Sequence, residues 1–185
     1  KRVLEDFTRN INQFKSYIKD IILIGRNGFV YNINSVDEIA RNYPFHEAPW
    51  MEPALSGTRE GIRFISTHVS DYYTGAFSRA KVVSAMLPIV KGRTVLGYVL
   101  CDINVQKFGE IFKSLSLGSG GFVYMVDQEG HVIFHPDSDR IGTKIDEDLL
   151  ASLSGGDAGY FRSMQPDGDK LIMYSQSKVT GWVLV

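Results

Sequence analysis

The sequence has a single cysteine, no long apolar run and almost no net charge. Its 185 residues include 20 Lys and Arg against 21 Asp and Glu, a formal net charge of −1. With this balance, the chain has no excess of positive charge that would attract nucleic acid or an anionic membrane surface. The lone Cys101 permits no internal disulfide, so cysteine usage does not reveal the redox compartment. The apolar runs at residues 21–24 and 95–101 are far shorter than the about 20 residues that cross a bilayer.

The composition is that of a folded chain. Hydrophobic residues make up 44% of it and charged residues 22%, with 11 Phe, which is too apolar for a disordered segment. The length suffices for one domain or two small ones. The chain starts at Lys1 without a Met or a signal-peptide pattern, and we therefore expect a segment of a longer protein.

The first residues carry a helical pattern. Apolar side chains recur at spacings of three and four, with polar residues on the other face, which predicts a helix over residues 3–21. The stripe consists of Val3, Leu4, Phe7, Ile11, Phe14, Ile18 and Ile21. Two heptads are too few to establish a coiled coil. The helix either packs on its own domain or forms a homodimer.

Beyond the helix, strand patterns occur twice in the same order. Residues 20–25 and 29–33 flank an Asn-Gly turn, and residues 81–90 and 94–103 form a second hairpin. A helical pattern over 105–115 and a small-residue break at 117–121 follow. The order then starts again. Segments 21–24, 81–83 and 97–100 align with 123–126, 170–172 and 181–184. We predict two antiparallel sheets with helices to one side, divided into residues 1–21, 22–116 and 117–185.

Three segments together resemble the double Cache family of sensor domains. Residues 121–137, GFVYMVDQEGHVIFHPD, resemble the membrane-proximal Cache module. Residues 88–103 are similar to the end of the distal module, and Thr180-Gly181-Trp182 to the strand that leads back toward the membrane. The resemblance spans nearly the whole chain and rests on the order and spacing of these segments.

The resemblance implies an α+β fold, in which one long N-terminal helix carries two PAS-like modules. It implies the extracellular or periplasmic sensing region of a bacterial transmembrane receptor, most like a two-component histidine kinase. The distal module would hold a small molecule and the proximal module would pass the change to the membrane, with both membrane spans outside this chain. The sensor domain of a chemoreceptor or cyclase, or a module that binds a protein partner, are the alternatives.

A mixture of aromatic and polar residues over 43–51 is typical of a small-molecule site, although the same aromatics would also suit a core beneath a loop. We expect the ligand-binding residues to be Tyr43, His46, Trp50, Met51, His68, Asp71 and Asp102. Asp102 has a second interpretation, because an acid after the last strand could cap the helix that starts near Val105.

The family resemblance also bears on the ligand. Its amino-acid-binding members clamp the ligand carboxylate with an Arg and a Trp and bind the ammonium group with acids. Trp50, Asp71 and Asp102 match that pattern, whereas Ala48 stands at the Arg position and Met51 at that of a tyrosine. Loss of a bidentate Arg removes about 1.5–3 kcal/mol of the free energy of carboxylate binding. A cationic amine or a small sugar is therefore favoured over a standard amino acid.

Patterns that would indicate an enzyme lack their context. The glycine-rich residues 118–121 precede a predicted strand rather than a helix, and the chain has no Gly-x-Ser-x-Gly elbow. His68 and Asp71 have no third partner at metal-ligand spacing. In the second half, we expect Asp127 to order its turn and His135 to close a strand. We expect no catalysis, no metal and no cofactor.

Overall fold

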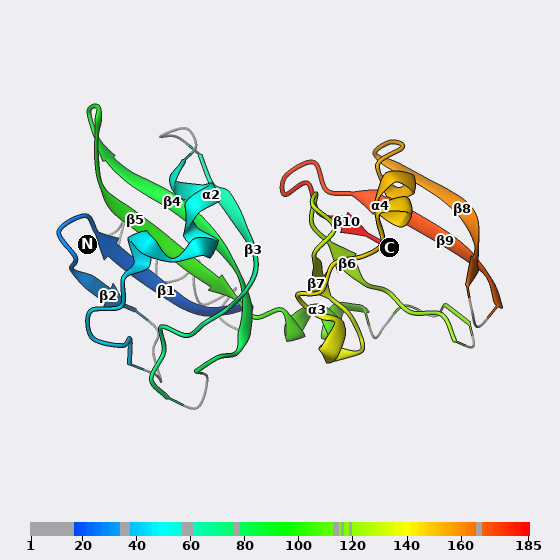
Figure 1. The fold of residues 1–185 in the computed structure, drawn as a ribbon, viewed down its shortest axis with the longest axis horizontal. Coiled ribbons are helices and arrows are strands. Elements are labelled where there is room, and N and C mark those ends of the chain that lie inside the picture. The colour runs from blue at the N-terminus through cyan, green and yellow to red at the C-terminus, as the bar shows by residue number, and fades with distance from the viewer. Residues whose placement is uncertain are drawn as a thin grey trace, which may run out of the picture. The chain divides into compact units, whose positions relative to one another are not determined.

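The computed structural model describes residues 17–33, 38–56, 61–75, 78–112, 115, 117–118, 120–165 and 168–185. The chain divides into two compact units, Lys1–Lys107 and Phe108–Val185. More of the described residues lie in strands than in helices (Figure 1).

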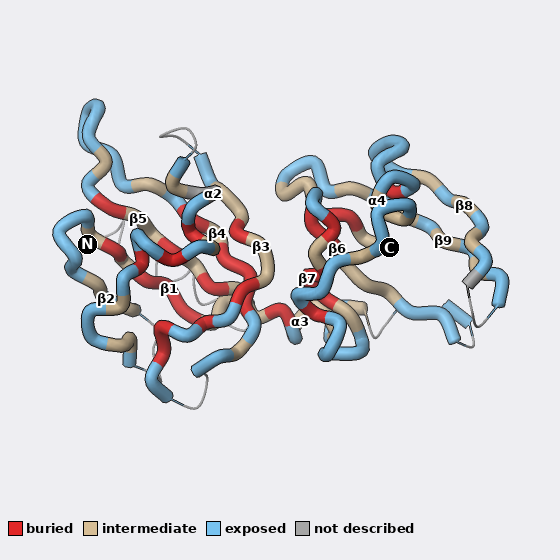
Figure 2. Tube along the Cα trace, in the orientation of Figure 1, coloured by how far each residue is buried: buried red, intermediate tan, exposed pale blue. Residues whose placement is uncertain are grey.

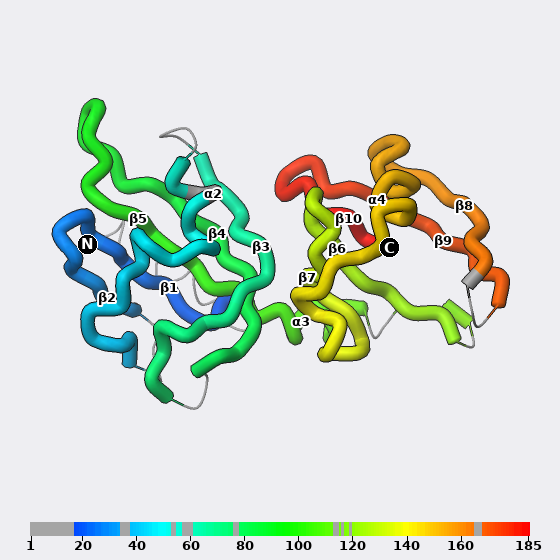
Figure 3. The backbone as a smooth tube through the Cα atoms, in the orientation of Figure 1, coloured from blue at the N-terminus to red at the C-terminus, as the bar shows by residue number. Residues whose placement is uncertain are grey.

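The first unit contains a five-stranded antiparallel sheet in the order β2-β1-β5-β4-β3. Its strands are β1 (Ile18–Gly25), β2 (Val30–Asn32), β3 (Arg63–Val69), β4 (Lys81–Lys91) and β5 (Thr94–Ile103). Strand β1 pairs with β5, although some 70 residues separate them, as the blue and green tubes in Figure 3 show. The turn between β1 and β2 is the predicted Asn-Gly turn, with Gly28 at a φ of 83°.

The core of the first unit lies between one sheet face and a short helical segment. This segment comprises η1 (Phe45–Glu47), η2 (Pro49–Met51) and α2 (Glu52–Leu55). Ile22 pairs with Leu100, and Leu100 with Met86, so that their side chains form one row on the same face. Phe45 and Met51 pack against this row. Figure 2 shows the buried stretches concentrated in β1, β4 and β5.

The second unit repeats this arrangement. Its strands, in the order β7-β6-β10-β9-β8, also form a five-stranded antiparallel sheet. They are β6 (Met125–Val126), β7 (Val132–Phe134), β8 (Ala158–Gln165), β9 (Gly168–Gln176) and β10 (Val183–Leu184). Helix α4 (Glu147–Leu153) contributes Leu153 to a core that also contains Val126, Val132 and Val183. The remaining elements are α3 (Gln106–Phe112) and η3 (Ser138–Arg140).

The two sheets confirm the internal repeat. Counted from the start of each unit, both sheets place their strands in the order second, first, fifth, fourth and third. The aligned segments 21–24 and 123–126 fall on β1 and at β6, and 97–100 and 181–184 fall on β5 and at β10. The two halves therefore have the same topology as well as similar sequence patterns.

The predicted α+β class with a long N-terminal helix is wrong for the described chain, which is mostly β. Residues 1–16 of the expected helix lie outside the described residues. Ile18 and Ile21, which continue the helical stripe, lie in strand β1. This segment contains four β-branched residues, and pairing with β2 and β5 outweighs the helical spacing of its apolar side chains. The expected homodimer through this helix stays a prediction.

The division between the units falls within α3, whereas the sequence break suggested residues 116 and 117. Phe108 and Phe112 of α3 contact Phe134 of β7, with ring centroids 6.5 and 5.4 Å apart, and Phe108 also contacts Trp182. These aromatic contacts join the helix to the second unit. The helix itself was predicted.

The expected role of Asp127 is confirmed. Its Oδ1 accepts hydrogen bonds from the backbone N–H groups of Glu129 and His131, at 2.9 and 2.8 Å, and its Oδ2 lies 3.2 Å from the His131 ring. The carboxylate thus orders the turn between β6 and β7.

Leu100 and Leu96 allow a matched test of this fold on one strand. Leu100 has no exposed surface, whereas Leu96 is 48% exposed. Leu100→Ala should lower the free energy of unfolding by about 2–4 kcal/mol, because it leaves a cavity in the core. Leu96→Ala should change it by about 0.5 kcal/mol or less. Urea unfolding of both variants measures the difference, and equal effects would contradict the placement of Leu100 in the core and of Leu96 at the surface.

Candidate functional site

A fully buried carboxyl group lies near the end of β5 in the first unit. Asp102 of β5 has no exposed surface and accepts three hydrogen bonds from hydroxyl groups. The Tyr72 and Tyr73 hydroxyls donate to Oδ2 at 2.6 and 2.9 Å, and the Ser84 Oγ donates to Oδ1 at 2.6 Å. Burial raises the pKa of Asp102, and the three donors oppose that rise because they stabilise the ionised form.

Strand register brings Ser84 to this position. Ser84 on β4 is the direct partner of Asp102 on β5, so both side chains project from the same sheet face. Tyr72 and Tyr73 follow β3, the strand on the other side of β4. The interpretation of Asp102 as a helix cap is wrong, because the Asn104 side chain accepts the hydrogen bond from the backbone N–H of Gln106 at 3.2 Å.

The partner of Asp102 on the neighbouring strand β1 is a second acid. Asp20 of β1 pairs with Asp102 and is 2% exposed. Its Oδ2 accepts a hydrogen bond from Asn32 at 3.2 Å and lies 3.4 Å from the Tyr73 hydroxyl oxygen, whose single hydrogen is directed to the nearer Asp102. Lys19 donates from Nζ to Ser70 Oγ at 3.1 Å and lies 4.4 Å from the centre of the Tyr73 ring. Tyr73 thus contacts both acids and one cation.

Four rings cover the buried Asp102 and Ser84. We call them the aromatic cluster, which consists of Tyr43, Trp50, His68 and Tyr72. Trp50 and His68 stack with centroids 4.2 Å apart and planes at 14°. The ring centroid of Tyr72 lies 5.5 Å from that of Trp50 and 5.6 Å from that of Tyr43. Burial lowers the pKa of His68, whose Nδ1 lies 2.9 Å from the Ser66 carbonyl oxygen. The cluster joins η2, β3 and the segments before η1 and after β3.

Asp71 is an exposed acid beside the cluster. Its Oδ1 accepts a hydrogen bond from the Tyr43 hydroxyl at 2.6 Å. Burial, together with this hydrogen bond to a carboxylate, raises the pKa of Tyr43 to about 12. Tyr43 therefore stays protonated near neutral pH and remains a donor to Asp71.

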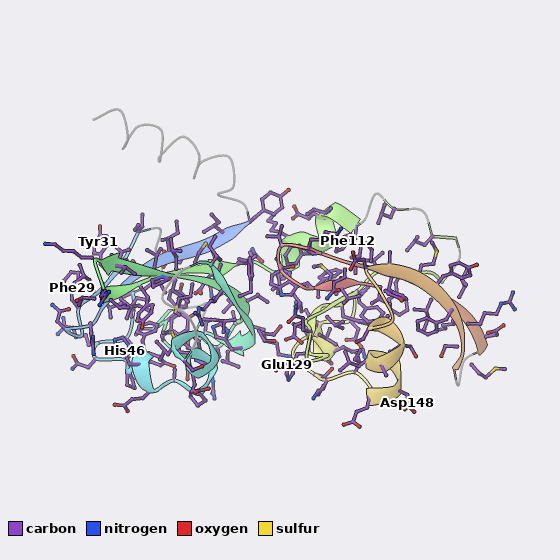
Figure 4. All side chains as sticks on the ribbon, turned by 90° about the horizontal axis from the view of Figure 1, so that it is seen from above. Phe29, Tyr31, His46, Phe112, Glu129 and Asp148 are labelled. Carbon is purple, nitrogen blue, oxygen red and sulfur yellow. The ribbon has the colours of Figure 1, made fainter. Side chains whose placement is uncertain are left out.

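The structure brings five of the seven predicted site residues together. Tyr43, Trp50 and His68 belong to the aromatic cluster, with Asp71 beside it and Asp102 beneath it. Met51 is instead fully buried in the core. His46 is exposed on η1, with its ring 6.0 Å from that of Tyr98 (Figure 4).

Sequence reasoning missed the three hydroxyl groups around Asp102. Tyr72 and Tyr73 lie outside the predicted strands and helices, and Ser84 lies within the strand predicted over residues 81–90. Two adjacent tyrosines between predicted elements are a usable signal, since large aromatic side chains rarely remain fully exposed. A lone serine within the apolar run 82–86 was another, because a buried hydroxyl needs a hydrogen-bond partner.

The arrangement of these groups does not suit catalysis. Ser84, His68 and Asp102 are the residue types of a hydrolase triad, but here the serine lies between the other two and is fully buried. Burial raises the pKa of Cys101 to about 11, so its thiol stays protonated. Within the described ranges, no group of three His, Cys, Asp or Glu side chains could hold a metal ion.

The sequence profile of the family described as "Cache domain", dCache_1, matches residues 1–185. The chain belongs to the double Cache family. Domains of this family are extracellular, non-catalytic ligand-binding sensors of transmembrane receptors. No helix in the described part of this Cache domain is long and apolar enough to cross a membrane.

The Cache domain has curated relatives among chemotaxis proteins. Methyl-accepting chemotaxis protein McpB of Bacillus subtilis is 22% identical over 180 residues, which are 96% of this chain and 26% of McpB. PctB of Pseudomonas aeruginosa is 23% identical over 118 residues, 64% of this chain and 18% of PctB. The chain thus spans about a quarter of McpB and less of PctB. These relatives do not support the expected closer likeness to histidine kinases.

Solved structures show the same fold. The ligand-binding domain of Pseudomonas aeruginosa PctB in complex with L-Gln has a TM-score of 0.70 at 17% identity, covering 93% of this chain and 68% of that one. The extracellular domain of the putative histidine kinase rpHK1S-Z16 has a TM-score of 0.77 at 17% identity, covering 100% of this chain and 76% of that one.

The buried Asp102 predicts a pH-dependent effect of its removal. Because its pKa is raised on folding, the unfolded chain ionises first, and wild-type stability falls as pH rises from about 3.8 toward the folded-state pKa. The Asn side chain of Asp102→Asn cannot ionise. The free energy of unfolding of this variant should therefore increase relative to that of the wild type as the pH rises over this range. Urea unfolding at a series of pH values gives the difference, and a pH-independent difference would contradict the assignment.

Proposed function

We propose that this Cache domain is the sensing domain of a chemoreceptor and that it binds a small cationic amine beside the aromatic cluster. The receptor type is supported by the curated relatives, which are methyl-accepting chemotaxis proteins. The ligand lies against Tyr43, Trp50 and Asp71.

The observation that carries the ligand class is the exposed carboxylate of Asp71 next to aromatic rings. Its only hydrogen bond among the described residues is the one from Tyr43 to Oδ1, which leaves Oδ2 available to a ligand. A cation attracted by a carboxylate gains further from an aromatic face within about 6 Å. A carboxylate and aromatic faces are the groups that recognise an ammonium ion.

The residue at position 48 argues against an α-amino acid. Structural relatives bind amino acids, including PctB with L-Gln and L-Arg. Where the amino-acid clamp of the family has an Arg, this chain has Ala48, which is 6% exposed and packed in the core. A methyl group cannot pair with a carboxylate, so the ammonium side of the recognition remains and the carboxylate side is lost.

A histidine kinase sensor domain is the second candidate for the parent protein. It is supported by the similarity to the extracellular domain of rpHK1S-Z16, whose TM-score of 0.77 exceeds the 0.70 of PctB with L-Gln. In either parent, a ligand in the first unit would bias one of two conformations, and the second unit would pass the difference on.

A ligand panel tests the proposed chemistry. Thermal unfolding with alkylamines, amino acids, monosaccharides and dicarboxylates should show a raised transition temperature for the amines, because a ligand stabilises the state that binds it. Asp71→Asn should weaken amine binding by about tenfold or more, as expected for loss of a charge-assisted contact. Isothermal titration calorimetry measures the affinity.

Asp148→Asn is the matched control. Asp148 is an exposed acid on α4 of the second unit, and its substitution changes the charge by the same amount (Figure 4). It should leave amine binding unchanged. A shift only with monosaccharides or amino acids, or equal effects of the two substitutions, would refute the amine proposal.

A further inference from the structure

Three buried polar groups form a continuous chain beneath the aromatic cluster. Ser84 Oγ lies 2.6 Å from Asp102 Oδ1 and 3.5 Å from His68 Nε2. Ser84 and Asp102 are fully buried, and His68 is 8% exposed. The chain runs from the sheet, through Ser84, to the imidazole that stacks on Trp50.

The hydrogen positions in this chain follow from its partners. The Ser66 carbonyl oxygen can only accept, so His68 Nδ1, 2.9 Å away, carries a hydrogen and donates it. In a neutral imidazole, Nε2 is then a bare acceptor. The single Ser84 hydroxyl hydrogen is directed to Asp102 at 2.6 Å. Nε2 therefore faces an oxygen lone pair at 3.5 Å, with no hydrogen between the two atoms.

One added proton completes the chain in either of two ways. If it binds His68 Nε2, the imidazolium donates to Ser84, which donates to Asp102. If it binds Asp102 Oδ1, the carboxylic acid donates to Ser84, which turns and donates to the neutral Nε2. In both forms each heavy atom of the chain has a hydrogen-bond partner, and the net charge of the three residues is zero.

We propose that His68, Ser84 and Asp102 share one proton and that its release tunes the amine affinity of the adjacent ligand face. The burial that raises the pKa of Asp102 and lowers that of His68 favours the form with the proton on Asp102. The coupling to the ligand rests on the proposed function, whereas the shared proton does not.

Charged and titratable groups from two other segments, β1 and the residues after β3, face this chain. The negative charge of Asp71, after β3, raises the pKa of His68, and the positive charge of Lys19, on β1, lowers it. Tyr72 and Tyr73 donate to Asp102, and Asp20 of β1 shares the Tyr73 hydroxyl with it. The tyrosine pKa values are raised by burial, so both hydroxyls stay protonated and supply fixed donors.

The sign of the coupling follows from the charge. Loss of the shared proton leaves one negative charge beneath the aromatic cluster, which attracts a cation. Amine affinity should therefore rise with pH through the titration of the chain, and amine binding should release the proton. For one charge acting through the protein interior, the change in affinity is about tenfold.

NMR titration tests the shared proton without any ligand. In the wild type, the carboxyl ¹³C shift of Asp102 and the Nε2 ¹⁵N shift of His68 should change at one common midpoint. Ser84→Ala removes the bridging hydroxyl, so the two shifts should separate into different midpoints. Separate midpoints in the wild type, or a common midpoint in Ser84→Ala, would overturn the proposal.

Tyr72→Phe is the matched control. It removes another hydroxyl donor to Asp102 but does not interrupt the chain to His68. The common midpoint should persist and move to higher pH, because the ionised carboxylate loses a donor. Thermal unfolding of both variants checks that they fold. Separated midpoints in Tyr72→Phe would show that Ser84→Ala acts only by loosening the core. That result would also overturn the proposal.

Calorimetry with propylamine at pH values on either side of the common NMR midpoint tests the coupling, because an alkylamine stays cationic while the carboxyl and imidazole groups titrate. Wild-type affinity should rise about tenfold with pH, and the rise should be smaller in Asp102→Asn. Asp71 is present in both proteins, so the difference between them belongs to Asp102. If propylamine does not bind at any pH, the proposed ligand class fails, while the NMR result still decides the shared proton. An equal rise in both proteins would overturn the coupling.

Discussion

A carboxyl group without contact to water is the constraint on which the first unit depends. Asp102 lies near the end of the central strand β5 and requires hydrogen-bond donors, because an isolated buried charge is very unfavourable. It obtains them from β4 and from the two tyrosines that follow β3. The register between β4 and β5 places Ser84 opposite Asp102. The path of the chain after β3 is fixed by the same requirement, since both tyrosine hydroxyls must reach one oxygen atom.

The aromatic cluster follows from this arrangement. With its hydroxyl held by Asp102, the Tyr72 ring contacts Trp50 and Tyr43, and Trp50 stacks on His68. Asp71 immediately precedes Tyr72, and its carboxylate lies beside the cluster rather than within it. The two acids thus have different surroundings. Asp102 stabilises the site from below, and Asp71 is the acid that a ligand can reach.

The internal repeat was readable from the sequence because both halves use the same hairpins and the same apolar pairs. Turn glycines, alternating strands and the helical spacing at α3 are local signals, and the structure has elements at each of them. The segment from Ile18 shows where local signals fail. Its spacing fits a helix as well as a strand, and only the partner strands β2 and β5 decide between the two.

The sequence by itself determined the repeat, the hairpins and the grouping of aromatic residues with acids in the first half. Each of these depends on residues that are close in the chain or recur at a fixed period. The tertiary structure alone decided that Asp102 is sealed by Tyr72, Tyr73 and Ser84 while Asp71 remains exposed. Those contacts join residues 18–30 positions apart, and strand register and burial, which no local pattern encodes, decide which side chains meet.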